Sequence, residues 1–262
     1  MRKCNLAVSL NAFARYSQTW ALDALEELGF WRVELWGQVA HIHPGDLSEA
    51  EAEIMARRVR KRGFELASYM PEAPHLNLAS GDALQREMAL QGWKRCIRQC
   101  AAMEIPLMPL YPGYSPLDAA PDPAIRLCMD GVDALKTEAQ GRGVELLLTH
   151  AEPPSLGAWE TIVALSRALN MGVALDVSLA AARGSAQMER CLSEERVRMI
   201  RLSDGPGGHL APGDGRIELV AVALAIHRAG MAERCVLTMD NRRYVMDPKA
   251  ALRRCAQQFA DW

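Results

Sequence analysis

Carboxylates and imidazoles recur in this sequence just after short apolar segments. Glu34 lies between Val33 and Leu35, and Asp176 ends the apolar run 172–176. An ionised carboxylate in such surroundings is costly unless it is paired, protonated or bound to a metal. We therefore expect Asp176 to take part in catalysis and Glu34 to bind a ligand, the alternative for Glu34 being an ion pair with a nearby lysine or arginine.

Further polar candidates follow other apolar segments. His209 lies in a glycine-rich stretch, 204–215, which brings backbone close to a neighbour or a ligand. Free backbone N–H groups there could cradle a phosphate, but a structural turn would use the same residues, and both interpretations stay open. The additional candidates are Trp36, His41, Glu72, His150, Glu152, Arg201, His209 and Asp240.

Regular elements must position these candidates, and the sequence predicts them. Short β-rich apolar runs alternate with longer helical patterns, which favours a parallel sheet built from βα units. Ser48 and Glu51 form a capping box at the start of one predicted helix, and Gly63 ends it. Eight strands are predicted, namely Asn5–Leu10, Arg32–Trp36, Glu65–Met70, Leu107–Tyr111, Val144–Thr149, Val173–Val177, Met199–Ser203 and Val236–Met239.

This number of βα units in 262 residues is typical of the closed (β/α)₈ barrel. An open doubly wound sheet would carry a glycine-rich phosphate turn after its first strand, where residues 11–14 of this chain read Asn-Ala-Phe-Ala. We therefore predict an α/β fold, a single TIM barrel spanning residues 1–262, and no nucleotide cofactor. In such a barrel the chemistry lies at the carboxyl ends of the strands.

The composition narrows the class of partner. The 30 basic and 32 acidic side chains give a net charge of −2 without a long block of one sign. We therefore expect a small-molecule partner, with no nucleic acid and no membrane surface. The N-terminus lacks a signal-peptide pattern and no segment has the roughly 20 apolar residues of a membrane span. The seven cysteines include no Cys-x-x-Cys pair, which fits reduced thiols in a cytoplasmic protein.

Several short motifs resemble a known family. They are residues 33–37, 175–176, 201–204 and 212–215. In order and spacing they are similar to the xylose isomerase-like TIM-barrel sugar phosphate isomerases and epimerases, over nearly the whole chain. Within that family, residues 36–41, 69–72 and 209–213 most resemble fructoselysine 3-epimerases, and 3-dehydroshikimate dehydratases are more distant.

The resemblance implies a sugar-like substrate and a divalent metal, Mn, Mg or Zn, held by glutamate, aspartate, histidine and glutamate from strands five to eight. Such a metal polarises a carbonyl while two carboxylates move a proton on and off the neighbouring carbon. In this sequence the strand-five glutamate falls on Leu148 or Thr149, the strand-seven histidine on Arg201 and the strand-eight glutamate on Thr238. Asp176 alone matches, and an arginine cannot ligate a metal.

Three interpretations follow. In the first, His150, Asp176 and Asp240 form a shifted metal site, with Glu152 as a further ligand. In the second, Arg201 supplies the positive charge and Asp176 or Glu152 acts as the base, without a metal. In the third, the barrel binds a sugar-like ligand without catalysis. A metal-free pocket with an Arg201–Asp176 ion pair would favour the second or the third.

We therefore expect a sugar isomerase or epimerase that transfers a proton next to a carbonyl, with a lyase or dehydratase of the same superfamily as an alternative. The expected catalytic residues are Asp176, Glu152 and Arg201. The expected substrate-binding residues are Glu34, Trp36, His41, Glu72 and His209. The resemblance also allows a homo-oligomer.

Overall fold

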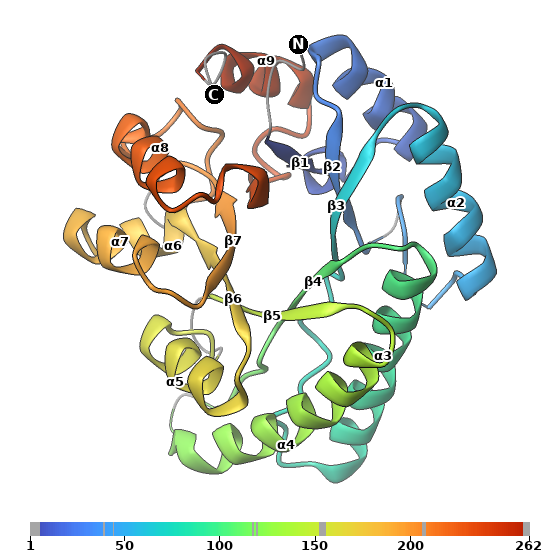
Figure 1. The fold of residues 1–262 in the computed structure, drawn as a ribbon, viewed down its shortest axis with the longest axis vertical. Coiled ribbons are helices and arrows are strands. Elements are labelled where there is room, and N and C mark those ends of the chain that lie inside the picture. Colours follow the sequence, from blue (N-terminus) through green and yellow to red (C-terminus); the bar gives the residue numbers. More distant parts are fainter. Residues whose placement is uncertain are drawn as a thin grey trace.

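The computed structural model describes residues 6–38, 40–43, 45–116, 118, 120–151, 156–205 and 208–258. Its parallel strands form one sheet in the order β3-β2-β1-β8-β7-β6-β5-β4. Strands β3 and β4, at the two ends of this order, contact each other, so the sheet rolls into a barrel with helices outside it (Figure 1). The predicted (β/α)₈ barrel is confirmed. The strands are β1 (Ala7–Ser9), β2 (Arg32–Trp36), β3 (Glu65–Met70), β4 (Leu107–Leu110), β5 (Glu145–Thr149), β6 (Gly172–Asp176), β7 (Val197–Leu202) and β8 (Cys235–Leu237).

Local signals mark the ends of several helices. Ser48 and Glu51 make the predicted capping box at the start of α2, and Gly29 ends α1 in the left-handed conformation with φ of 81°. The helices are η1 (Leu10–Phe13), α1 (Gln18–Leu28), α2 (Glu49–Lys61), α3 (Ala83–Ala102), α4 (Pro121–Gln140), α5 (Trp159–Leu169), α6 (Val177–Ala181), α7 (Ser185–Leu192), α8 (Leu219–Arg228), η2 (Ala232–Arg234) and α9 (Pro248–Gln258).

The predicted strand bounds hold for β2 and β3 and shift at the ends of the other strands. Strand β1 ends early because the Ser9 side chain accepts a hydrogen bond from the Asn11 amide and starts the 3₁₀ helix η1 at Leu10. Strand β6 ends at Asp176 because its carboxylate accepts from the Leu179 amide and caps α6. Both chain segments therefore turn into helical backbone directly at the barrel mouth.

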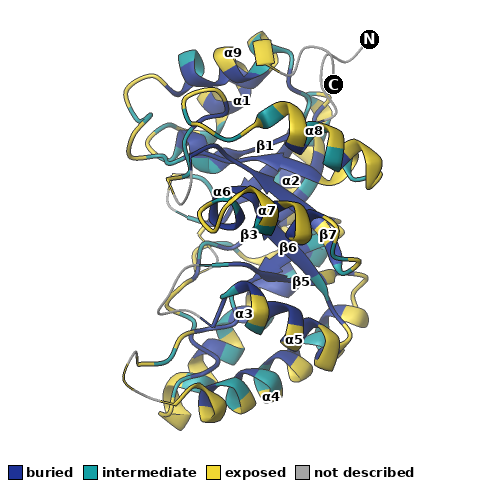
Figure 2. Cartoon of the chain, turned by 90° about the vertical axis from the view of Figure 1, so that its left-hand side faces the viewer, coloured by how far each residue is buried: buried dark blue, intermediate teal, exposed yellow. Residues whose placement is uncertain are grey.

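Two apolar clusters lie on the two faces of the sheet. The larger one packs the strands against the inner faces of the helices, which Figure 2 shows as buried. The smaller one fills the barrel and includes residues of β5 to β8. Because side chains alternate along a strand, the residue two positions later lies on the same face. The apolar residues Leu147, Ala174, Met199 and Val236 are thus followed inside the barrel by Thr149, Asp176, Arg201 and Thr238.

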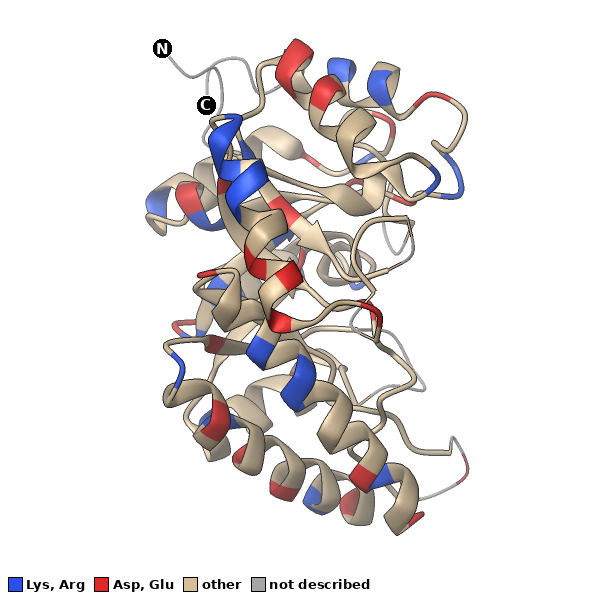
Figure 3. Ribbon diagram, turned by 90° about the vertical axis from the view of Figure 1, so that its right-hand side faces the viewer, with Lys and Arg blue, Asp and Glu red and all other residues tan. Residues whose placement is uncertain are grey.

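The outer surface carries charges of both signs interspersed along the helices (Figure 3). Arg62, for example, lies 2.6 Å from Asp23 and 2.9 Å from Glu26. In the described part of the chain, no helix is long and apolar enough to cross a membrane. Cys96 and Cys100 on α3 are fully buried, and burial raises the pKa of the Cys96 thiol to about 12, so both pack as small apolar side chains.

Candidate active site

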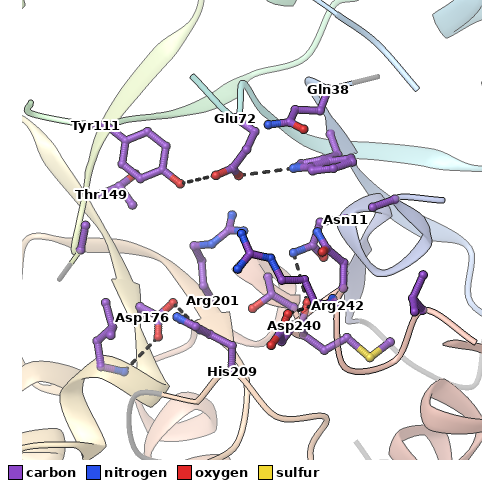
Figure 4. Close-up of a pocket in the computed structure, with 18 of the residues that line it drawn as sticks. Asn11, Gln38, Glu72, Tyr111, Thr149, Asp176, Arg201, His209, Asp240 and Arg242 are labelled. Atoms are coloured by element: carbon purple, nitrogen blue, oxygen red, sulfur yellow. Dashed lines mark hydrogen bonds and ion pairs between the residues drawn. The ribbon is translucent and has the colours of Figure 1, made fainter. Parts of the chain in front are cut away.

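A cavity of about 1050 Å³ opens at the carboxyl ends of the strands. Figure 4 shows side chains from different strands and loops converging on it. The predicted residues that line it are Trp36, Glu72, His150, Asp176, Arg201, His209 and Asp240. Lining residues to which the sequence assigned no catalytic or binding role include Asn11, Arg15, Gln38, Tyr111, Thr149 and Arg242.

Arg201 and Glu34 form a buried ion pair at the cavity floor. Arg201 Nη1 donates to Glu34 Oε1 at 2.9 Å and to Oε2 at 2.8 Å, joining β7 to β2. Glu34 also accepts a hydrogen bond from the Ser68 hydroxyl at 2.9 Å. Burial by itself would lower the pKa of Arg201, but the surrounding acidic groups, Glu34 foremost, raise it overall. The guanidinium therefore stays charged inside the barrel.

This pair joins two of the residues that the sequence singles out. Glu34 is 0 % exposed and does not line the cavity, and its carboxylate holds Arg201 in place. The partner of Arg201 is Glu34 and not Asp176. The alternative that Glu34 is ion-paired with an arginine is the one the structure shows.

The other donors of Arg201 face the cavity. Its Nε and Nη2 have no hydrogen-bond partner among the described residues, whereas Nη1 is used by Glu34. A guanidinium carries five N–H donors in a fixed plane. In Figure 4 the guanidinium extends into the space between Glu72 and Asp176. Arg201 can therefore donate to an oxygen of a bound ligand while Glu34 holds it from below.

Glu72 forms one acidic corner of the site. Its Oε2 accepts a hydrogen bond from the Trp36 indole and its Oε1 accepts from the Tyr111 hydroxyl, both at 3.3 Å. Burial first, and then the charge of Glu72, raises the pKa of Tyr111, so its hydroxyl stays protonated and donates. These two donors fix the orientation of a half-buried carboxylate that faces the cavity.

Asp176 and His209 form the opposite corner. Asp176 Oδ1 accepts from the Leu179 amide at 3.0 Å, and its Oδ2 lies 3.5 Å from His209 Nδ1. His209 has a left-handed backbone with φ of 45°, and its amide donates to the Ser178 hydroxyl. His209 Nε2 has no partner within the residues described. Asp176 thus orients an imidazole whose second nitrogen is free for a ligand.

The glycine-rich loop after β7 is a structural turn. The buried carboxylate of Asp204 accepts hydrogen bonds from the backbone amides of Gly205, Gly213, Gly215 and Ile217, at 2.6 to 3.1 Å. These amides are therefore not available to cradle a phosphate. The loop presents His209 to the cavity instead.

The donors at the expected metal positions do not fit a divalent cation. Thr149 lines the cavity, whereas Leu148 packs in the core outside the barrel. Thr149 and Thr238 therefore offer hydroxyls where the resemblance implies carboxylates. The position of the strand-seven histidine is taken by Arg201, whose charge repels a cation.

The described residues of the predicted shifted metal site face the same cavity. His150, Asp176 and Asp240 all line the cavity, but Asp240 Oδ1 accepts the backbone amide of Arg242 at 2.9 Å. In the described ranges, no group of three histidine, cysteine, aspartate or glutamate side chains could hold a metal. Glu152, expected as a further ligand or as the base, lies outside the described residues.

His41 contacts residues next to the cavity. Its Nε2 lies 3.0 Å from the Phe13 carbonyl oxygen, and its ring packs edge-on against Trp36 with 5.9 Å between centroids. Burial lowers its pKa despite the hydrogen bond to Phe13. His41 does not line the cavity. Its ring contact is with Trp36, which does line the cavity.

Three buried polar atoms on the cavity wall have no partner in the part of the chain that the structure describes. They are Asn11 Oδ1, Thr149 Oγ1 and His150 Nδ1. Buried polar atoms are nearly always hydrogen-bonded, so such orphans need an explanation. Burial, the largest effect, lowers the pKa of His150 and favours its neutral form. These atoms suit a ligand that carries several hydroxyl groups.

Among the lining residues to which the sequence assigned no catalytic or binding role, Tyr111 and Thr149 share one signal. Tyr111 directly follows β4, and Thr149 ends β5, both at the position where the inner face of a strand reaches the cavity. The inside–outside alternation along each strand would have singled out both. Arg15 and Arg242 lie in loops, where periodicity carries no signal.

Comparisons with known proteins place the chain in a family. The family model described as "Xylose isomerase-like TIM barrel" matches residues 22–260. A search of curated proteins found no significant match. Among solved structures, the chain is similar to a D-tagatose 3-epimerase-like protein, with 17% identity, a TM-score of 0.78 and 97% of each chain covered.

Two further solved structures have the same fold. One is an L-ribulose 3-epimerase, with 14% identity and a TM-score of 0.79 over 97% of this chain and 92% of that one. The other is the IolI protein with a bound zinc atom, with 15% identity and a TM-score of 0.76 over 97% and 95%. At these identities the likeness shows the fold. Together with the match of the family model, it shows that the chain belongs to the xylose isomerase-like TIM-barrel family.

Proposed function

We propose that this protein is an isomerase or epimerase of a small hydroxylated carbonyl compound, such as a sugar derivative, and transfers a proton next to the carbonyl. The observation that carries the proposal is Arg201, which Glu34 holds on the cavity floor with free N–H donors between two carboxylate corners. The orphaned polar atoms on the wall and the 3-epimerases among the similar structures support a hydroxylated substrate.

In this proposal, Arg201 is the electrophile that polarises the carbonyl group of the substrate. The carbonyl oxygen of the substrate accepts hydrogen bonds from its free N–H groups. When the neighbouring carbon loses its proton, negative charge develops on that oxygen, and a fixed cation stabilises this charge more than the neutral carbonyl. Glu34 keeps the guanidinium oriented, so little reorganisation is needed during the reaction.

The two corners exchange the proton. The Glu72 carboxylate removes the proton from the carbon beside the carbonyl, and the imidazolium of His209, paired with Asp176, returns one. Figure 4 shows Glu72 and His209 on opposite sides of Arg201, which suits return of the proton to the opposite face and hence epimerisation. Return to the former carbonyl carbon would give isomerisation.

Solvent deuterium exchange tests the proposal. A panel of ketoses and their acidic and phosphorylated derivatives is incubated with the protein in D₂O, and NMR follows the proton next to the carbonyl. We expect exchange with at least one compound, reduced about 100-fold in Asp176→Asn because the imidazole loses its charged partner.

Asp82→Asn is the matched control, since Asp82 caps α3 as Asp176 caps α6 but lies outside the cavity lining. It should exchange like the wild type. Absence of exchange across the whole panel would contradict the proposal. Binding of a compound without exchange would instead identify a sugar-binding protein without catalysis.

A further inference from the structure

We infer that the substrate carries an anionic group at one end, a carboxylate or a phosphate ester, which Arg15 and Arg242 bind at the mouth of the cavity. The inference rests on the proposed function, because it concerns the substrate of the same cavity. It narrows that substrate to a negatively charged hydroxycarbonyl compound.

The two arginines lie on neighbouring parts of the rim. Arg15 follows η1, which comes directly after β1, and Arg242 lies in the loop after β8. Strands β1 and β8 are paired in the sheet, so both loops leave the barrel on one side. Both arginines are exposed, and both line the cavity.

Neither guanidinium is neutralised within the described part of the chain. No carboxylate described lies within ion-pair distance of Arg15 or Arg242, although Arg62 and Arg254 elsewhere on the surface have such partners at 2.6 to 2.9 Å. Asp240, the nearest acidic residue in sequence, accepts the backbone amide of Arg242 at 2.9 Å and so shapes the turn that carries it. Figure 4 shows the Arg242 side chain extending into the cavity.

The positive charge deeper in the cavity is already paired. Arg201 is matched by Glu34, and Asp176 lies beside His209. The uncompensated positive charge of the site is therefore at the rim, while the electrophile is on the floor. A substrate that binds to Arg201 on the floor and to the arginines at the rim has its carbonyl at Arg201 and its anionic end at the mouth of the cavity. Guanidinium groups bind carboxylates and phosphates with paired, charge-assisted hydrogen bonds.

Isothermal titration with matched compounds tests the inference. D-fructose, D-fructose 6-phosphate and D-fructuronate share a ketose core and differ in the terminal group, so they separate a neutral, a phosphorylated and a carboxylated ligand. We expect at least one anionic compound to bind more tightly than D-fructose. Arg15→Gln and Arg242→Gln should each weaken its binding about three- to tenfold, as expected for a solvent-exposed charged hydrogen bond, and leave D-fructose unaffected.

Arg243→Gln is the control, because Arg243 is the exposed neighbour of Arg242 in the same loop and does not line the cavity. It should bind every compound like the wild type. Equal or tighter binding of the neutral sugar, an equal loss for all compounds in the Arg15 and Arg242 variants, or binding of none of the three would overturn the inference. The proposed function would survive these results if a neutral ketose still exchanged deuterium.

Discussion

Glu34 and Asp204 are both buried carboxylates close to the barrel mouth, and they have different roles because their partners differ. Asp204 is surrounded by backbone amides, and each amide has one proton, which the carboxylate uses. Glu34 is paired with a guanidinium that has donors left over. Asp204 therefore fixes a loop, whereas Glu34 holds the charged guanidinium of Arg201 in a position where it can bind a ligand.

The largest effect is expected from breaking the Glu34 pair. Glu34→Ala leaves Arg201 charged and buried, which should lower the free energy of unfolding by about 3–5 kcal/mol. The double variant Glu34→Leu/Arg201→Met removes both charges and should recover most of that loss. Urea unfolding measures both. A cost below about 1 kcal/mol for the single variant would show that the pair is not desolvated.

Asp204 should behave as a purely structural carboxylate. Asp204→Ala leaves its amide donors without an acceptor and should lower the free energy of unfolding by about 2–3 kcal/mol, somewhat less than Glu34→Ala because the loop can open to water. Urea unfolding checks this value. Full stability of the variant would mean that the amides find other acceptors and that Asp204 does not organise the loop.

Arg201→Lys tests whether the free donors of the guanidinium paired with Glu34 act in the reaction. Lysine keeps the charge but cannot hold Glu34 and donate to the substrate in one plane. We expect kcat/KM to fall about 100-fold, equivalent to about 2.7 kcal/mol. Arg198→Lys, on the same strand but exposed, should have no effect. Equal activity of the Arg201 and Arg198 variants would argue against a role for Arg201 in the reaction.

The smallest effect concerns pH. Burial lowers the pKa of His41 and His150 below their ordinary value of 6.5. Below pH 6.5 both histidines are therefore protonated in the unfolded chain but still neutral in the folded protein. The free energy of unfolding should fall as the pH decreases, until the pH is below the lowered pKa values of the folded state. Thermal unfolding between pH 7 and pH 5 should show a shallower decline in His41→Gln and His150→Gln. An unchanged slope would contradict these shifts.

Much of the fold could be predicted, because the strands of the barrel and the helix caps depend on residues that are close together in the sequence. The capping box of Ser48 and Glu51 needs only four neighbouring residues. Asp176 and Arg201 could be found because a charged residue in an apolar strand is conspicuous. Strand ends were harder to predict, since Ser9 and Asp176 also cap the helices that follow them.

Partners distant in sequence could not be predicted. Glu34 and Arg201 are 167 residues apart, and only the closure of the barrel brings them together. The glycines of 204–215 indicated a loop, but the choice between a phosphate and Asp204 as the acceptor depended on the folded geometry. Nothing in the sequence distinguishes Arg15 and Arg242 from other surface arginines, and only the folded structure shows that both line the cavity.

The most direct test of the account is solvent deuterium exchange in protein that has been dialysed against a chelator. We predict that the wild type still exchanges the proton next to the carbonyl of its substrate, because Arg201 supplies the positive charge. The double variant Glu34→Leu/Arg201→Met should stay folded and lose exchange. Exchange that disappears on chelation and returns with a divalent metal, or that persists in the double variant, would contradict the account.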